Sequence, residues 1–272
     1  MRGATWTLCE CGTLKVGEGF VHQSMRSGSW SSTISPWNAH RHSISRIIFS
    51  ENVVMGYSLA GLFRDLSSAT TIEGLEYFDT SNVRIMYGVF NGMNSLSSLD
   101  LSNWNTGNVT DMSSMFFRTD ALVELDVSGW NTSNVTDMSS MFGTTHSLVS
   151  LDLSNWDTSR VTNMTNMFAH TLSLAILDLS GWDTYNVGQA RMNNFFAEMT
   201  NLRSLTLGEN FVLRGGPMLP AVRVTSEFTG YWQNVGSGTP ERPRGEHVLT
   251  SVQLMSQFHG ATMADTWVWQ PR

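Results

Sequence analysis

The sequence predicts an α/β repeat solenoid, because one phrase recurs at a fixed period and each copy alternates apolar and polar residues. The phrase occurs four times, as LDLSNWNT from Leu99, LDVSGWNT from Leu125, LDLSNWDT from Leu151 and LDLSGWDT from Leu177. Successive copies start 26 residues apart. Self-similarity at a fixed period of this length is the signature of a protein built from stacked coils.

Each unit is expected to hold one short parallel strand and one short helix. The triplet LDL alternates apolar and polar residues, as a half-buried strand does. The following VTDMSSMF places its apolar residues three and four apart, which predicts one apolar stripe on a helix. The residues expected to cap these helices are Thr110, Thr136 and Thr162. A single unit buries too little apolar surface to offset the entropy of ordering it, so neighbouring units must stack.

The repeats divide the chain into three parts. Residues 1–46 show no repeat and predict a β-rich N-terminal cap, with two short strands around Cys11-Gly12. Residues 47–211 form the predicted solenoid, which begins with a degenerate first coil and includes worn copies from Leu75 and Leu205. Residues 212–272 predict a small C-terminal α+β domain, with a linker VLRGGPMLPAV, a helix after Thr250 and a closing strand TWVWQ.

Three pairs of side chains outside the repeats have a functional and a structural interpretation. Cys9 and Cys11 are too close in sequence for an unstrained disulfide and are expected to be incidental small apolar residues. His40 and His42 lack a third metal ligand, so an exposed loop is favoured over a metal site. The last pair, at 267 and 269 in the closing strand, could stack on a sugar ring, although paired tryptophans more often pack in a core.

Composition excludes several classes of function. Charged residues make up 14% and the net charge is −7, so no basic stripe is present for a nucleic acid. No apolar run is long enough to span a membrane, and the residues after Met1 lack the apolar core of a signal peptide. No catalytic or phosphate-binding motif is present, so we expect that the protein is not an enzyme and binds no cofactor or metal ion. We also expect a monomer.

The full unit, LDLSNWDTSRVTNMTNMF in the copy from Leu151, resembles the BspA-like repeat of bacterial surface proteins. The spacing Leu96-x-x-Leu99-x-Leu101-x-x-Trp104 is that of a leucine-rich repeat with Trp at the usual Asn or Cys position. The resemblance covers residues 72–211. It implies a right-handed solenoid on the surface of a Gram-positive commensal or a mycoplasma, secreted or attached to the cell wall, and this chain would then lack its signal and anchor segments.

The resemblance also implies a role in adhesion, with a host or bacterial surface protein or glycan as partner. The alternative is a structural spacer without a ligand of its own. A spacer should have uniform outer positions, as Ser102, Ser128, Ser154 and Ser180 do, whereas a binder should vary from copy to copy. The varying positions are Ser98, Glu124, Ser150, Ile176 and Ser204, and they favour a binding module.

An acidic ladder is the most specific functional feature. Candidate binding residues are Asp100, Glu124, Asp126, Asp152, Asp178 and Ile176. The ladder consists of the aspartates that repeat with the period, Asp100, Asp126, Asp152 and Asp178. Each lies between two inward-facing apolar residues and is expected on the outer face. The structural interpretation is that Ser hydroxyls and turn amides hydrogen-bond each carboxylate. The functional alternative is a weak, salt-sensitive contact with a basic partner, since a regular ladder lacks the converging ligands of a tight Ca²⁺ site.

Two further expectations concern the packing of the coils. The indoles of Trp104, Trp130, Trp156 and Trp182 should be buried and stacked. The Asn82, Asn108, Asn134 and Asn186 positions should lie at the surface, because Arg160 takes the same place in one copy and a buried charge would need a partner.

Overall fold

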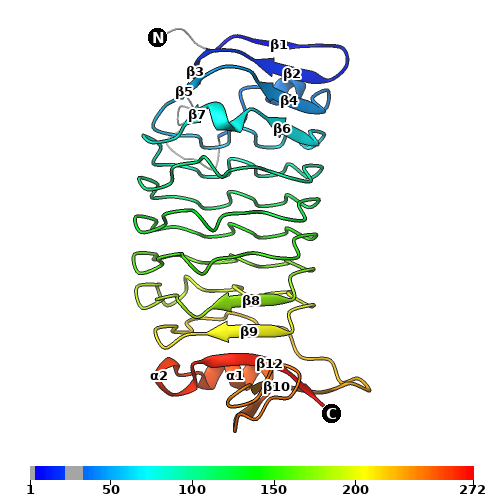
Figure 1. Ribbon diagram of the computed structural model, residues 1–272, viewed down its shortest axis with the longest axis vertical. Helices are drawn as coiled ribbons and strands as arrows, with labels where there is room; N and C mark the ends of the chain where they lie inside the picture. Colours follow the sequence, from blue (N-terminus) through cyan, green and yellow to red (C-terminus); the bar gives the residue numbers. More distant parts are fainter. Residues whose placement is uncertain (1–3, 22–32) are drawn as a thin grey trace.

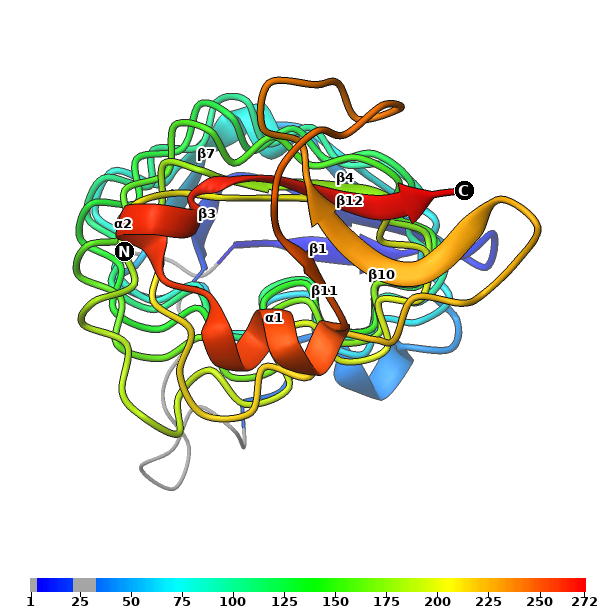
Figure 2. The ribbon, with the colours of Figure 1, turned by 90° about the horizontal axis from the view of Figure 1, so that it is seen from below.

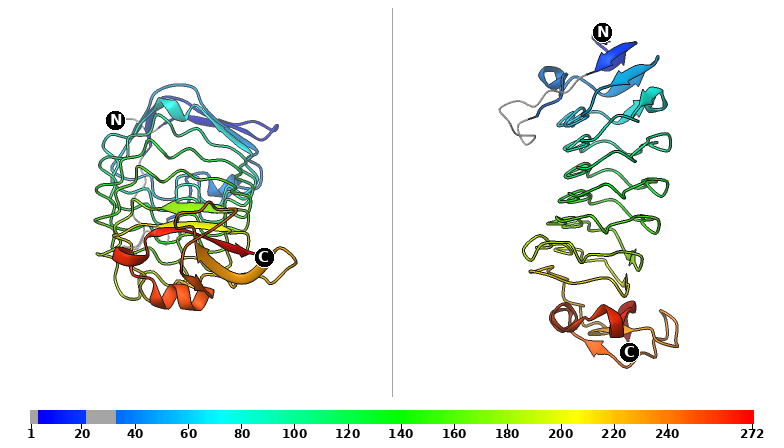
Figure 3. Two further views of the ribbon diagram at one scale, coloured as in Figure 1. Left: turned by 60° about the horizontal axis from the view of Figure 1, so that its bottom comes forward. Right: turned by 90° about the vertical axis from the view of Figure 1, so that its left-hand side faces the viewer.

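A computed structural model describes residues 4–21 and 33–272. The chain winds into successive coils stacked along the long axis of the molecule, with the N-terminal strands at one end and the C-terminal segment at the other (Figure 1). The views in Figure 3 show the same stack from the side and from below. Residues 22–32 of the expected N-terminal cap lie outside the described residues.

The N-terminal segment covers the first coil with two small sheets. The predicted strands around Cys11-Gly12 are confirmed as the antiparallel hairpin of β1 (Trp6–Leu8) and β2 (Thr13–Val16). One sheet continues in parallel through β4 (Arg46–Phe49) and β6 (Thr71–Glu73), and the other joins β3 (Gly19–Val21), β5 (Val53–Met55) and β7 (Phe78–Asp79). Two 3-10 turns, η2 (Asn38–His40) and η3 (Leu75–Tyr77), lie between these strands. Parallel pairing of the backbone therefore starts at the cap and continues into the coils.

Backbone hydrogen bonds join each coil to the next. Parallel bridges connect Ser58, Ile85, Asp111, Asp137 and Asn163 in sequence. Beside this column, alternate amides of one coil donate to carbonyls of the next, namely Met112 to Asp137, Ser114 to Ser139, Phe116 to Met141 and Arg118 to Gly143. The stack is held by main-chain bonds between units as well as by side-chain packing.

The expectation of one helix in every unit is wrong. The segment VTDMSSMF contains no helix: turns run from Ser113 to Arg118, and Ser114 (φ 56°) and Arg118 (φ 60°) adopt left-handed backbone conformations. The same two positions are left-handed in the later units, at Ser140 and Thr144, Asn166 and His170, and Asn194 and Glu198. A left-handed residue every fourth position interrupts a helix, and alternate amides bond to the next coil instead of four residues back.

The expected strand at LDL forms only in the last units. There β8 (Ile176–Leu179) pairs in parallel with β9 (Ser204–Leu207). In the copies from Leu99, Leu125 and Leu151 the same positions carry no strand. Close to these positions the Val149 N–H donates to the Val123 carbonyl at 3.1 Å, and the Trp156 indole N–H donates to the Val127 carbonyl. The apolar alternation is correct nevertheless, since the leucines point inward.

Aromatic columns fill the core. The predicted burial of all four tryptophans is confirmed, and their stacking on one another is confirmed from Trp130 to Trp182. The four indoles are at most 4% exposed, and Trp156 stacks between Trp130 and Trp182 with ring centroids 6.4 and 6.3 Å apart. A parallel column of phenylalanines comes from the turn side, at Phe90, Phe116, Phe142 and Phe168. Side chains of one type thus stack directly on their equivalents one coil away.

Polar columns satisfy the backbone at the corners of the coils. Each buried threonine of the NT or DT pair donates its hydroxyl to a carbonyl of the next coil, at Thr80, Thr106, Thr132, Thr158 and Thr184. The Thr110, Thr136 and Thr162 hydroxyls donate to carbonyls of the preceding coil and cap no helix. The surface prediction for the Asn column is confirmed: Asn134 is half-buried, Arg160 is exposed, and the Asn amides donate to preceding turn carbonyls.

The C-terminal segment ends the stack with an antiparallel sheet. β12 (Asp265–Pro271) pairs with β9 on one side and with β10 (Phe228–Asn234) on the other, and β10 pairs with β11 (Val248–Leu249). The predicted helix is confirmed as α1 (Ser251–Gln257), which Thr250 caps, and it is followed by α2 (Gly260–Met263). Figure 2 shows this segment lying across the end of the coils.

The expected linker also covers the last coil. The carbonyls of Gly216 and Pro217 accept the amides of Asn194 and Phe196, which occupy the positions that donate to a further coil elsewhere in the stack. Of the tryptophans proposed as a sugar platform, Trp267 is fully buried, and Trp269 is half-buried beneath Arg203. Core packing is therefore the correct interpretation. None of the helices in the described part of the chain is long and apolar enough to cross a membrane.

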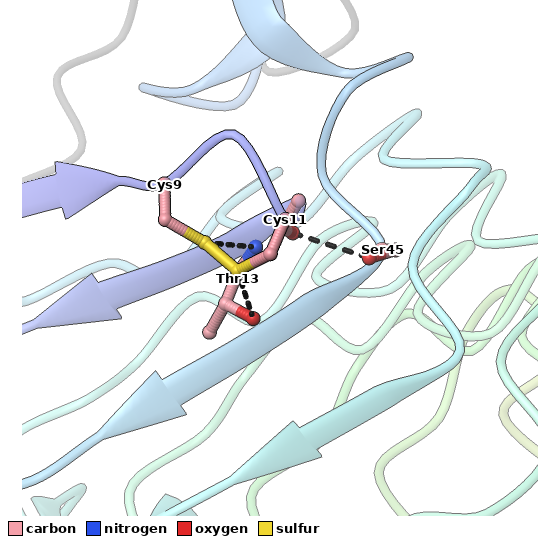
Figure 4. Close-up of a disulfide and its surroundings, with 5 residues drawn as sticks. Cys9, Cys11, Thr13 and Ser45 are labelled. Atoms are coloured by element: carbon pink, nitrogen blue, oxygen red, sulfur yellow. Dashed lines mark hydrogen bonds between the residues drawn. A yellow bond between two sulfur atoms is a disulfide. The ribbon is translucent and has the colours of Figure 1, made fainter.

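The N-terminal cysteine pair is joined, so the expectation of two incidental side chains is wrong. Cys9 and Cys11 form a disulfide at the tip of the β1–β2 hairpin (Figure 4). The turn brings them together, because the Gly12 amide bonds the Cys9 carbonyl and Gly12 has a left-handed φ of 81°. His40 and His42 are exposed, as expected for a loop.

Candidate binding groove

A hollow of about 570 Å³ opens on the outer face of the stack where three successive coils meet. Its lining comes from residues 124–126, 149–152 and 175–176, which are equivalent segments one repeat apart. Four of the six candidate residues line it together: Glu124, Asp126, Asp152 and Ile176. The remaining two, Asp100 and Asp178, are exposed on the same column but do not line the hollow.

The groove exposes apolar side chains between its acidic residues. Ile176 is 66% exposed and Val149 is 47% exposed, and Val123 lies just before the lining segment with 42% exposed. Sequence reasoning singled out Ile176 and missed both valines. A signal for them was present, since the column Ser97, Val123, Val149, Ala175 and Arg203 varies from copy to copy as a binding surface should. Exposed apolar side chains gathered in a hollow are typical of an interaction surface.

Hydrogen bonds from neighbouring serines keep the groove aspartates charged. Asp126 accepts from the Ser128 amide at 3.0 Å and from its hydroxyl at 2.7 Å, and Asp152 accepts from the Ser154 amide at 3.0 Å. These bonds lower the pKa of both carboxyls, outweighing the small opposite effect of Asp126 on Asp152. The structural interpretation of the ladder is confirmed for these residues. Their contribution to stability is present above the unfolded-state pKa and is lost as the pH falls through the folded-state pKa.

No internal cation neutralises the groove within the described ranges. None of the three recorded salt bridges involves Glu124, Asp126 or Asp152. One oxygen of each ladder aspartate already accepts bonds from its serine, which leaves the other oxygen and the Glu124 carboxylate facing outward. The arrangement offers negative charge beside apolar surface, without the converging oxygen ligands that a tight Ca²⁺ site needs.

Asp111, in a second acidic column, has a pKa shifted in the opposite direction, and this gives a prediction. Burial raises the pKa of the half-buried Asp111 carboxyl, although the Ser113 hydroxyl and amide oppose this effect, and the neighbouring Asp137 adds to it. Two coils on, the column carries Asn163, whose amide donates to Asp137 at 2.9 Å. We expect Asp111→Asn to raise the melting temperature at neutral pH by about 1–3 °C, because it removes a charge that folding disfavours.

The pH dependence checks the sign of this effect. A raised carboxyl pKa makes folding less favourable as the pH rises through it, so the gain from Asp111→Asn should shrink in acid. Asp100→Asn is the control, since bonds from Ser102 lower the pKa of that carboxyl. This control should stabilise the protein at no pH, and an equal gain in both variants would show that general charge reduction is responsible.

The fold and the groove define a repeat protein with an exposed acidic and apolar surface. The model of a family described as "Mycoplasma protein of unknown function, DUF285" matches residues 57–150 and 117–208, which together span more than half of the chain. The chain belongs to this family, and the match indicates a bacterial repeat protein. No curated protein and no solved structure matches the chain.

Proposed function

We propose that this protein is a surface binding module, adhesin-like, which contacts a host or neighbouring-cell macromolecule through the groove. The observation that carries the proposal is the coincidence of exposed Val149 and Ile176 with charged Asp126 and Asp152 in one hollow. A surface with no partner would gain solubility from polar residues at these positions. The net charge of −7 favours a basic protein partner over a nucleic acid.

The proposal includes a setting at the bacterial cell surface. The match to a Mycoplasma family and the resemblance of the repeat to BspA-like surface proteins support it. In this setting the stack is a right-handed solenoid of the leucine-rich-repeat type, secreted or attached to the cell wall. The alternative is a spacer that lifts another domain from the surface, and the uniform serine column of the outer face favours it.

Binding to an array of extracellular-matrix proteins, bacterial surface proteins and glycans tests the proposal. The probe is the whole chain, compared with the double variant Val149→Ser and Ile176→Ser. We expect binding to at least one macromolecule, weakened about tenfold or more in the double variant, which equals about 1.4 kcal/mol.

The matched control is Val252→Ser, which replaces a 78% exposed valine on α1, far along the chain from the groove. This control should bind as the parent does. Silence of the parent across the whole array would favour the spacer. If the double variant bound as tightly as the parent, the contact would lie outside the groove.

A further inference from the structure

We infer that the groove seats one amphipathic helix of a partner protein, lying along the axis of the stack, with apolar residues on the valine side and Lys or Arg residues toward the aspartates. The inference rests on the proposed function and specifies the partner. It assigns one occupant to the hollow lined by Val149, Ile176, Asp126 and Asp152.

The groove presents two stripes that run in the same direction. One is apolar and crosses three coils through Val123, Val149 and Ile176. The other is acidic and crosses the first two of these coils through Asp126 and Asp152, continuing to Asp178 beyond the hollow. The aspartates are equivalent residues one coil apart, and so are Val123 and Val149, whereas the stripe shifts by one residue to Ile176 in the third coil, where the equivalent residue is Ala175. Both stripes therefore run along the stack and not along the strands. A ligand that follows them must repeat its own surface at each coil.

The step between coils is close to the pitch of an α-helix. Parallel bridges join successive coils, and β8 pairs in parallel with β9, so neighbouring coils lie about 4.8 Å apart as paired strands do. A helix rises about 5.4 Å per turn. It therefore brings one residue of each face over each coil, at spacings of three and four residues.

An extended segment does not match in this way. Side chains on one face of a strand repeat every second residue, about 6.6 Å apart, so their mismatch with the coils grows by about 1.8 Å at each step, against about 0.6 Å for a helix. A glycan is disfavoured by the composition of the lining, which holds Leu, Val, Ile, Ala, Ser, Asp and Glu and no aromatic ring for a sugar to stack on. A ligand with basic residues alone is also disfavoured, because it would leave the apolar stripe exposed to water.

The charge of the groove determines which side chains of the partner helix face the aspartates. The carboxylates of Asp126 and Asp152 stay ionised because their serine bonds favour the charged form, and Glu124 adds a third negative group at the rim. A helix in this site would place its Lys or Arg stripe beside its Leu or Val stripe. Contacts between exposed charges are weakened by salt, whereas the apolar contacts are not. Binding should therefore be partly salt-sensitive.

Two synthetic peptides of identical composition test the inference. Each has about 14 residues, or about four helical turns, made of Leu, Lys and Ala with a fluorophore at one end. In the first, Leu and Lys form adjacent stripes at helical spacing. In the second, the same residues are permuted so that Leu and Lys alternate with a period of two. We expect fluorescence anisotropy to show about tenfold tighter binding of the helical peptide.

Paired charge variants locate the contact within the ladder. Asp126→Asn with Asp152→Asn should weaken the helical peptide about tenfold at low salt and reduce the dependence on salt. The matched control is Asp79→Asn with Asp157→Asn, which removes the same number of charges from turns whose serine amides bond the carboxylates, in a column that carries Asn105 and Asn131 in other copies and lies outside the hollow. This control should bind nearly as the parent does. Thermal melts of both pairs establish that each is folded.

The remaining outcomes separate the two proposals. Equal or tighter binding of the alternating peptide would overturn the helix and identify an extended ligand. An equal loss in both charge pairs would overturn the assignment to the groove. If a macromolecule on the array needs Val149 and Ile176 while neither peptide binds, the helix is refuted and the proposed function stands. If the array and both peptides are silent, both proposals fail.

Discussion

Trp156→Ala is expected to lower the free energy of unfolding by about 3–5 kcal/mol. The indole of Trp156 is 2% exposed and lies between Trp130 and Trp182, nearly parallel to both. It also donates its N–H to the Val127 carbonyl of the preceding coil at 3.1 Å. Truncation therefore leaves a cavity between two coils and an unpaired carbonyl. Urea unfolding followed by circular dichroism measures the change.

The loss should spread to neighbouring coils, because each unit is stable only through its neighbours. We expect fluorescence of the remaining tryptophans to report a broader transition than in the parent. Trp6→Ala is the control, since this ring is 45% exposed at the N-terminal hairpin. If Trp156→Ala and Trp6→Ala melted within about a degree of each other, the central position of the Trp column in the core would be wrong.

Gly208→Ala should cost about 1–3 kcal/mol, as overpacking of a closed site does. Gly208 directly follows β9, and a Cβ atom there would lie well inside contact distance of the Ser180 carbonyl oxygen in the preceding coil. The obstacle is backbone, which cannot rotate away as a side chain can. The last coil would have to move from its neighbour, so the pairing of β8 with β9 would weaken.

Gly181→Ala provides the comparison at the coil interface that precedes this one. A Cβ at Gly181 meets its nearest atom, the Ser154 carbonyl oxygen, at 3.5 Å, which is ordinary contact. This variant should melt close to the parent, and hydrogen exchange should show extra opening of β8 and β9 only in Gly208→Ala. Equal melting of the two variants would show that the last coil yields without cost.

The periodicity of the sequence was sufficient to predict the stacking and the inward-facing residues. Burial of the Trp column, the hairpin around Gly12, the helix after Thr250 and the surface position of Arg160 all followed from residue patterns. These features depend on which side chains recur at each period. That information is contained in one sequence when the sequence repeats itself.

Conformation within the turns could not be predicted in this way. Apolar residues three and four apart fit a helix, and they fit equally a chain of turns with left-handed residues at Ser114 and Arg118. A Ser or Arg residue in a sequence does not predict a positive φ, whereas a Gly residue often does. The Cys9–Cys11 disulfide was missed because its geometry depends on a turn, and the groove valines were missed because they precede the repeated phrase.

The direction of the amide bonds has a consequence for the evolution of the chain. In the column that starts at Met112, each coil gives bonds through its amides to the carbonyls of the next coil, and the segment around Gly216 and Pro217 takes the last ones. Duplication or loss of one whole interior unit therefore recreates the same junction. Such proteins can gain or lose whole coils by recombination within a gene. The length of the stack is then inherited, while its two ends stay unchanged.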